Sequence, residues 1–265
     1  MKVKQITFLL LSCTSLLTNA QRIEVGLMAG GANYVGDIAP TMVASETRFA
    51  RGIFGRVNIS STFAFTASYF RTSLTGTDQN FEFNQPRNLS FKTSIKEYAG
   101  VVEFNYLKYA LGILDKKYTS YVYLGFGMVE YTPETFFENA WVDLRPLQTE
   151  NVSYNSFSYV IPFGIGFKWN FKPSYSIEAN LGFRKTYTDY LDDVSTVYVD
   201  PAATAKDKGT PAMLIADRSA ELNNGVPQNG AGYRRGNADF NDWYIIVGVS
   251  LTYRIFNSQK CPRFY

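Results

Sequence analysis

The stretch SYVIPFGIGFKWN at residues 158–170, followed closely by SYSIEANLGFRKT at residues 174–186, decides the fold. In the first segment, apolar side chains occupy every second position, and Gly164, Gly166 and Lys168 lie between them on the opposite face of the strand. In the second, Glu178 and Arg184 alternate with apolar residues in the same way. Alternation with a period of two is typical of a β-strand that has one apolar face. The short connection predicts that the two strands are neighbours in an antiparallel sheet.

Six further segments show this alternation: Arg22 to Gly30, Arg51 to Ser60, Thr62 to Ser73, Ser94 to Leu107, Ser120 to Tyr131 and Trp243 to Phe256. The seven connections between the eight runs have about 20, 1, 20, 12, 26, 3 and 56 residues, so long and short ones alternate. This is typical of outer-membrane barrels, with long extracellular loops, short periplasmic turns and both termini in the periplasm. A secreted soluble β-sandwich is the alternative, but it has no reason to alternate loop lengths. We predict an all-β fold, an eight-stranded antiparallel transmembrane β-barrel of the bacterial outer membrane.

The first twenty residues are typical of a secretory signal peptide. Lys2 and Lys4 precede an apolar run from Ile6 to Leu17, and small residues end at Ala20. We therefore assign residues 1–20 to the signal and residues 21–265 to the barrel domain. The alternative is a lipoprotein signal in which Cys13 is lipidated. After residue 20, no apolar stretch approaches the length of a transmembrane helix.

The composition excludes several function classes. The 265 residues contain no histidine, which removes Ser-His-Asp triads and histidine metal sites. Cys13 and Cys261 are too few for a cysteine-rich metal site. A formal charge of +3 does not favour nucleic-acid binding. We predict a protein that is not an enzyme and has no cofactor, no metal, no nucleic-acid partner and no small-molecule substrate.

The inward face of the predicted strands carries a balanced set of charges. These residues are Glu24, Arg56, Glu97, Glu103, Lys168, Glu178, Arg184 and Arg254. Eight strands enclose a space that side chains just fill, and buried charges are tolerated only when they are paired. We expect an internal salt-bridge network that plugs the barrel. The alternative is a charged lining that selects solutes in a pore.

Acidic residues gather where the seventh run enters the longest connection. Asp189, Asp192, Asp193 and Asp200 could offer oxygen ligands to Ca²⁺. Their spacing is not that of an EF-hand, and a solvated acidic loop is the simpler interpretation.

Basic residues gather in the segments predicted to be periplasmic. The candidates for partner binding are Lys108, Lys116, Lys117, Lys172, Lys260 and Arg263. Such a rim could dock on an acidic partner. Equally, it could be a solvated rim near the membrane surface.

Several stretches together resemble the PorG family, the small barrels of the type IX secretion system of Bacteroidota. The most specific is RKTYTDYLDDVS at residues 184–195. The others are at residues 30–37, 52–58, 103–106, 141–150, 161–166, 242–244 and 260–264. The resemblance runs over essentially the whole chain after the signal.

This resemblance implies an eight-stranded barrel without enzymatic activity or cofactor. It also implies association with a periplasmic ring built by the lipoprotein PorK and its partner PorN. The implied role is to anchor or assemble that ring at the outer membrane, in support of protein secretion and gliding motility. Two other functions stay open: an adhesin-like or structural barrel that acts through its extracellular loops, and a transporter of small apolar solutes with a lateral opening.

Overall fold

The computed structural model describes residues 22–109 and 117–255, and β-strands dominate this part of the chain. Eight long strands and one short one follow each other: β1 (Arg22–Val35), β2 (Arg48–Asn58), β3 (Phe63–Thr77), β4 (Ser90–Asn105), β5 (Tyr118–Phe137), β6 (Ala140–Asp143), β7 (Phe157–Lys172), β8 (Tyr175–Thr186) and β9 (Trp243–Arg254).

The eight long strands close into an antiparallel barrel. Hydrogen bonding follows the order β4-β3-β2-β1-β9-β8-β7-β5, and β4 also pairs with β5. The short strand β6 extends β5 as a hairpin and takes no part in closing the barrel. The predicted fold of eight antiparallel strands is thereby confirmed. β6 was not predicted, because four residues are too few to show a period.

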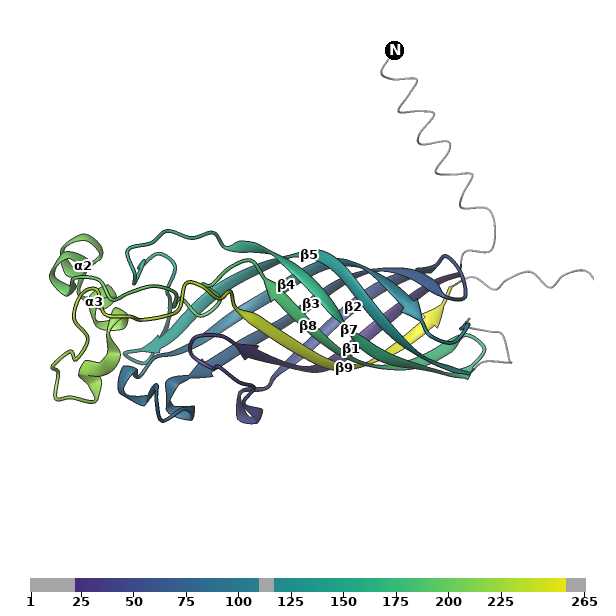
Figure 1. Ribbon diagram of the computed structural model, residues 1–265, viewed down its shortest axis with the longest axis horizontal. Helices are drawn as coiled ribbons and strands as arrows, with labels where there is room; N and C mark the ends of the chain where they lie inside the picture. The colour runs from purple at the N-terminus through teal and green to yellow at the C-terminus, as the bar shows by residue number, and fades with distance from the viewer. Residues whose placement is uncertain (1–21, 110–116, 256–265) are drawn as a thin grey trace, which may run out of the picture.

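The two ends of the barrel differ sharply (Figure 1). One end carries the connections 36–47, 78–89, 138–156 and 187–242, and we call it the loop end. Its short helices are α2 (Pro201–Lys208), α3 (Thr210–Ala216) and the 3-10 helices η1 (Ala44–Glu46), η2 (Asp78–Asn80), η3 (Gln85–Arg87) and η4 (Arg218–Glu221). The opposite end, where β1 begins and β9 ends, has the short turns 59–62 and 173–174, and we call it the turn end.

Several strands run further toward the loop end than the alternation suggested. β3 continues to Thr77 and β5 to Phe137. At the end of β3, Leu74, Thr75 and Gly76 are all buried, so the contrast between a buried and an exposed face fades there. The centres of the strands were therefore easier to locate from the sequence than their ends.

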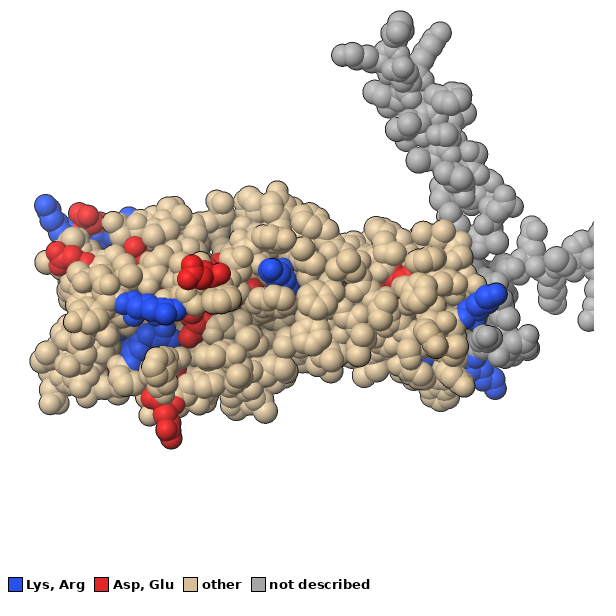
Figure 2. All heavy atoms as spheres, viewed as in Figure 1, with Lys and Arg blue, Asp and Glu red and all other residues tan. Residues whose placement is uncertain are grey.

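The outer wall of the barrel is apolar over most of its height. Exposed side chains on it include Leu27, Ile53, Leu124, Phe126, Ile165 and Val249. In the view of Figure 2, charged atoms gather at the loop end and at the turn end, and the wall between them carries few. Among the described residues, no helix is long and apolar enough to cross a bilayer.

Candidate functional site

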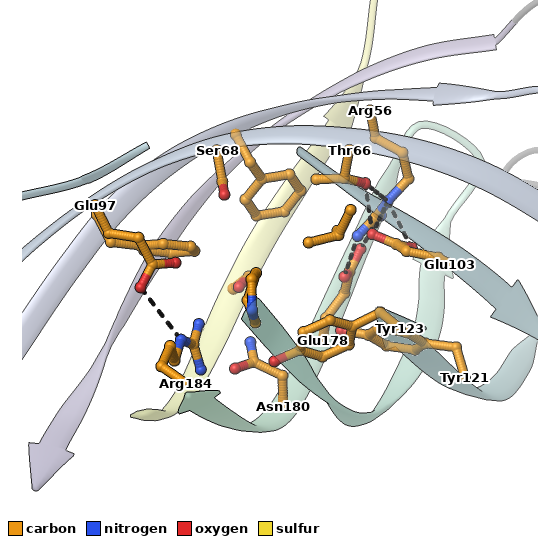
Figure 3. A pocket seen from close by; sticks show the side chains of 15 residues that line it. Arg56, Thr66, Ser68, Glu97, Glu103, Tyr121, Tyr123, Glu178, Asn180 and Arg184 are labelled. Carbon is orange, nitrogen blue, oxygen red and sulfur yellow. Dashed lines mark hydrogen bonds and ion pairs between the residues drawn. The ribbon is translucent and has the colours of Figure 1, made fainter. Parts of the chain in front are cut away.

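The half of the barrel interior toward the turn end is held together by ion pairs (Figure 3). Arg56 on β2 lies at the centre. Its guanidinium donates to both carboxylate oxygens of Glu178 at 2.5 and 2.7 Å, and to Glu24 at 3.1 Å. It also lies 3.0 Å from Glu103, which pairs in turn with Lys168 at 2.5 Å. All five side chains are almost fully buried.

A second ion pair lies in the interior, closer to the loop end. Arg184 contacts Glu97 at 3.4 Å, and the hydroxyl of Tyr244 donates to the same carboxylate at 2.5 Å. Arg254, the eighth predicted residue, is also buried and stands opposite Glu24 in the strand register. The structure therefore places all eight predicted charges inside the barrel. Their inward positions follow from the alternation of inward and outward side chains along each strand.

Little space is left between these side chains. The cavity bounded by Arg56, Glu97, Glu178 and Arg184 has a volume of about 50 Å³, room for only a few water molecules. Polar groups this deeply buried are stable only with partners. The half of the described interior toward the turn end is thus a filled polar core, and it has no space for a pore.

Toward the loop end, the interior changes from ionic to apolar. Tyr34, Phe91, Ile95, Tyr131 and Ile246 form a buried cluster on four different strands, β1, β4, β5 and β9. The connection after β8 folds down into this cluster and buries Leu191 and Val194 completely. The segment 189–195 is therefore a cap that closes the mouth of the barrel.

One tyrosine ties the cap to the barrel wall. The hydroxyl oxygen of Tyr34 lies 2.6 Å from Asp192 Oδ2 and 2.6 Å from Asp242 Oδ1. A tyrosine hydroxyl carries a single hydrogen and can donate to only one of the two carboxylates. The second contact requires a protonated carboxyl that donates to the tyrosine oxygen. The three groups thus share at least one carboxyl proton.

A buried arginine ties the cap to the other loops. Arg235 donates to Glu150 Oε1 at 2.9 Å and to the backbone oxygen of Asp193 at 2.5 Å. Glu150 also accepts from the backbone nitrogens of Ser195 and Thr196. Two different connections, 138–156 and 187–242, are joined in this way. The cap is therefore held in place by hydrogen bonds to the charged groups of Arg235 and Glu150.

The interpretation of the acidic segment as a solvated loop was wrong. Asp192 and Asp193 are 1% exposed and Asp189 is 7% exposed. Tyr34 and Thr149, from distant parts of the chain, donate hydrogen bonds to Asp192 and Asp193. Asp200 lies apart from them and caps α2 by accepting from the backbone nitrogen of Ala202. No group of three or more carboxylate or thiol side chains suited to a metal ion occurs in residues 22–109 and 117–255.

Burial changes the acidity of the cap. Desolvation raises the pKa of Asp189 to about 7 and the pKa of Asp193 to about 6. Desolvation also raises the pKa of Asp192 well above its usual range, and the nearby Asp37 adds to the effect. The pKa of Asp242 is raised in the same way, first by desolvation and then by the charge of Asp192. This direction agrees with the proton that the Tyr34 contacts require.

The predicted basic rim is described in part. Lys108, Lys117 and Lys172 are exposed and lie at the turn end. The backbone oxygen of Lys117 accepts from Asn170, so Lys117 and Lys172 lie on neighbouring strand ends. Lys116, Lys260 and Arg263 lie outside the described residues, as do the expected signal peptide 1–20, Cys13 and Cys261.

The fold resembles that of small outer-membrane barrels. Neisserial surface protein A is 7% identical, with 88% of this chain and 97% of that one covered and a TM-score of 0.44. Ail, the attachment invasion locus protein of Yersinia pestis, solved with the heparin analogue sucrose octasulfate, is 8% identical, with 89% and 99% covered and a TM-score of 0.43. OprG from Pseudomonas aeruginosa is 7% identical, with 89% and 98% covered and a TM-score of 0.37.

No curated protein sequence matches the chain. Residues 3–200 match a family described as a domain of unknown function, DUF6089. The match begins near the first residue and reaches the N-cap of α2, so it includes every strand except β9. The chain therefore belongs to the DUF6089 family.

Proposed function

We propose that this protein is a non-catalytic outer-membrane barrel that anchors or assembles the periplasmic ring of a type IX secretion system. The ring would be of the PorK/PorN type, and the turn end would face the periplasm. Protein secretion and, in gliding bacteria, motility would depend on this anchorage. The proposal combines the resemblance carried by residues 184–195 with three features of the structure.

The first feature is the filled interior, which is the observation that carries most weight. A barrel whose core is occupied by paired charges and whose mouth is closed by a cap has only its surfaces left for function. Neighbouring strands pair around the described barrel, although the β5–β7 ladder skips Gly125 and Phe126. Surface binding is therefore better supported than transport.

The second feature is the apolar wall, which suits a bilayer. The third is the exposed lysine group at the turn end, formed by Lys108, Lys117 and Lys172. Lysines that project from a rigid barrel rim can orient an acidic partner by complementary charge.

The test is to reverse two of these charges with K117E/K172E. The matched control is K206E/K208E, which makes the same charge change on α2 at the loop end. Barrels would be crosslinked in cells, extracted in mild detergent, and the co-purifying chains identified by mass spectrometry. We expect ring components to be recovered with the wild type and the control, and to fall at least about tenfold with K117E/K172E.

Recovery of the ring at wild-type level with K117E/K172E would remove the lysine rim as the docking surface. Failure to recover any ring component with the wild type, even after crosslinking, would contradict the secretion role itself.

A second candidate is binding at the cell surface through the loop end. Phe83, Tyr233 and Phe240 are 94%, 68% and 72% exposed there. Phe83 and Phe240 border a groove of about 760 Å³. Exposed aromatic residues around a groove are typical of binding surfaces. The substitutions F83S/F240S test this role without touching the cap, and unchanged surface attachment of cells would argue against it.

A further inference from the structure

Three cations stand side by side on the outer wall of the barrel. Arg51 on β2 is the register partner of Arg71 on β3, and Arg71 is the register partner of Lys96 on β4. All three belong to the outward-facing positions of their strands, and Arg51 and Arg71 are exposed. Lys96 pairs with Glu130 on β5 at 3.0 Å. Within the described residues, no hydrogen bond or ion pair engages the side chain of Arg51 or Arg71.

The row lies at a boundary. On the side toward the turn end, the next outward row is apolar and aromatic, with Ile53, Tyr69, Tyr98 and Met128 in register. On the side toward the loop end, the next outward residues are Ser73, Ser94 and Thr132 on β3, β4 and β5, and the exposed Phe49 on β2. From Phe63, the first residue of β3, to Arg71 the strand advances about 26 Å, or about 20 Å along the axis at the usual strand tilt. Together with the turn that precedes β3, this height is comparable to the apolar band of an outer-membrane barrel.

The arrangement is unfavourable for the barrel alone. Like charges directly opposite each other on neighbouring strands destabilise a sheet. Only one of the three cations has a carboxylate partner, so Arg51 and Arg71 leave an uncompensated double charge at the edge of an apolar wall. An anion held between the two guanidinium groups would remove this repulsion, and phosphate fits the planar guanidinium by paired hydrogen bonds.

An apolar groove lies on the turn-end side of the two arginines. It has a volume of about 650 Å³ and is lined by Leu27, Ile53, Tyr69, Leu251 and Tyr253. Its floor is formed by small residues, Gly55 and its register partner Ala67. A side-chain carbon added at Gly55 would meet no atom within 4 Å, so the floor is open to the outside. Arg51 and Arg71 do not line the groove, but each lies two residues along its strand from a lining residue, Ile53 or Tyr69. An apolar groove with two cations next to its edge fits an acyl chain with a phosphate headgroup.

We propose that Arg51 and Arg71, with the groove over Gly55 and Ala67, form a binding site for a phosphate-bearing membrane lipid. The headgroup phosphate lies between the two guanidinium groups, and an acyl chain lies along the groove. The site is on the loop-end side of the apolar wall. It rests on the proposed membrane placement of the barrel and would select lipids of the outer leaflet.

The purified full-length barrel would be titrated in mild detergent with lipid A that carries two phosphates, and in parallel with its dephosphorylated form. Native mass spectrometry would count the lipids bound. We expect the phosphorylated form to bind at least about tenfold more tightly. R51Q/R71Q should lose this preference, whereas K206Q/K208Q, the same charge change on α2, should keep it.

A separate variant tests the role of the groove. G55L fills the groove where no atom is displaced, and it should weaken the binding of both lipid forms while the headgroup preference stays. An undiminished preference for the phosphorylated lipid in R51Q/R71Q would overturn the proposal. Displacement of the lipid by inorganic phosphate together with full binding by G55L would also overturn it, because the site would then hold free phosphate.

Measuring whether the barrel inserts into a membrane distinguishes a failure of the lipid site from a failure of the membrane placement on which the proposed function also depends. Heat-modifiable mobility on gels and protease resistance in phosphatidylcholine vesicles report whether each variant forms an inserted barrel. A wild type that inserts but shows no headgroup preference contradicts the lipid site alone. A wild type that does not insert contradicts the membrane placement, and the lipid site with it.

Discussion

Arg56 joins three glutamates of the barrel interior into one ionic cluster. It is the common partner of Glu24, Glu103 and Glu178, which come from β1, β4 and β8. Removing one member of a buried ionic cluster leaves uncompensated charge and costs more than the pair contributes. Interior and surface arginines of this barrel should therefore differ widely in their effect on stability.

We expect R56Q to lower the free energy of unfolding by about 3–5 kcal/mol. R71Q makes the same chemical change on the outer wall and should alter it by no more than about 0.5 kcal/mol in lipid-free detergent. Urea or guanidinium unfolding of the detergent-solubilised barrel measures both. Equal effects of the two substitutions would show that the interior network contributes no more than a surface charge.

Asp189 should give the cap a pH dependence. Its pKa rises to about 7 in the folded protein, above the ordinary value of an unfolded chain. Its contribution to stability is therefore full in acid and is lost as the pH rises through about 7. D189N cannot ionise and should remove this part of the loss. Hydrogen exchange at the backbone amides of Leu191 and Val194, measured from pH 5 to pH 8, reports the opening of the cap.

In wild type, protection of these amides should fall with rising pH more than the intrinsic exchange rate explains. In D189N the fall should be smaller, though not absent, because the pKa values of Asp192 and Asp242 are also raised. An identical pH profile in both proteins would mean that Asp189 does not titrate in this range.

At the scale of the elements, glycine sets how closely β1 and β9 approach. A Cβ on Gly30 would lie 2.0 Å from the backbone oxygen of Val247, which cannot move without moving β9. G30A should therefore separate the two strands and cost about 1–3 kcal/mol. G55A is the control, since a Cβ there meets no atom within 4 Å. Thermal unfolding followed by circular dichroism compares them, and equal midpoints would contradict the steric argument.

The alternation of residues was enough to predict which elements form and which way their side chains face. It located the centres of all eight barrel strands and, through their parity, the inward position of Glu103 and Lys168. It could not show that residues 189–195 fold into the barrel. Their burial depends on Tyr34 and Asp242, which lie 158 and 50 residues from Asp192 along the chain. Local patterns carry no trace of such contacts.

At the scale of the whole molecule, the barrel has two separate barriers to flow. The cap closes the loop end, and the ionic core fills the half toward the turn end. Loss of the first should not open the second, because the cavity among the interior charges holds only about 50 Å³.

We therefore expect L191S/V194S to expose the cap to proteases and still to pass no steady ion current in a planar bilayer. Wild type should pass none either. A stable open-channel current in the variant would show that the cap alone closes a pore, and it would favour a transport function.

The closed strand order has a mechanical consequence. An open sheet under load fails by peeling, which starts at an edge strand and breaks one hydrogen bond after another. Here β4 pairs with β5 and the ladder returns on itself, so the described part of the barrel wall has no edge strand. A pull on a turn between two strands acts along the strands and loads many hydrogen bonds in shear at once. Such a wall resists a force that acts along its strands better than an open sheet does.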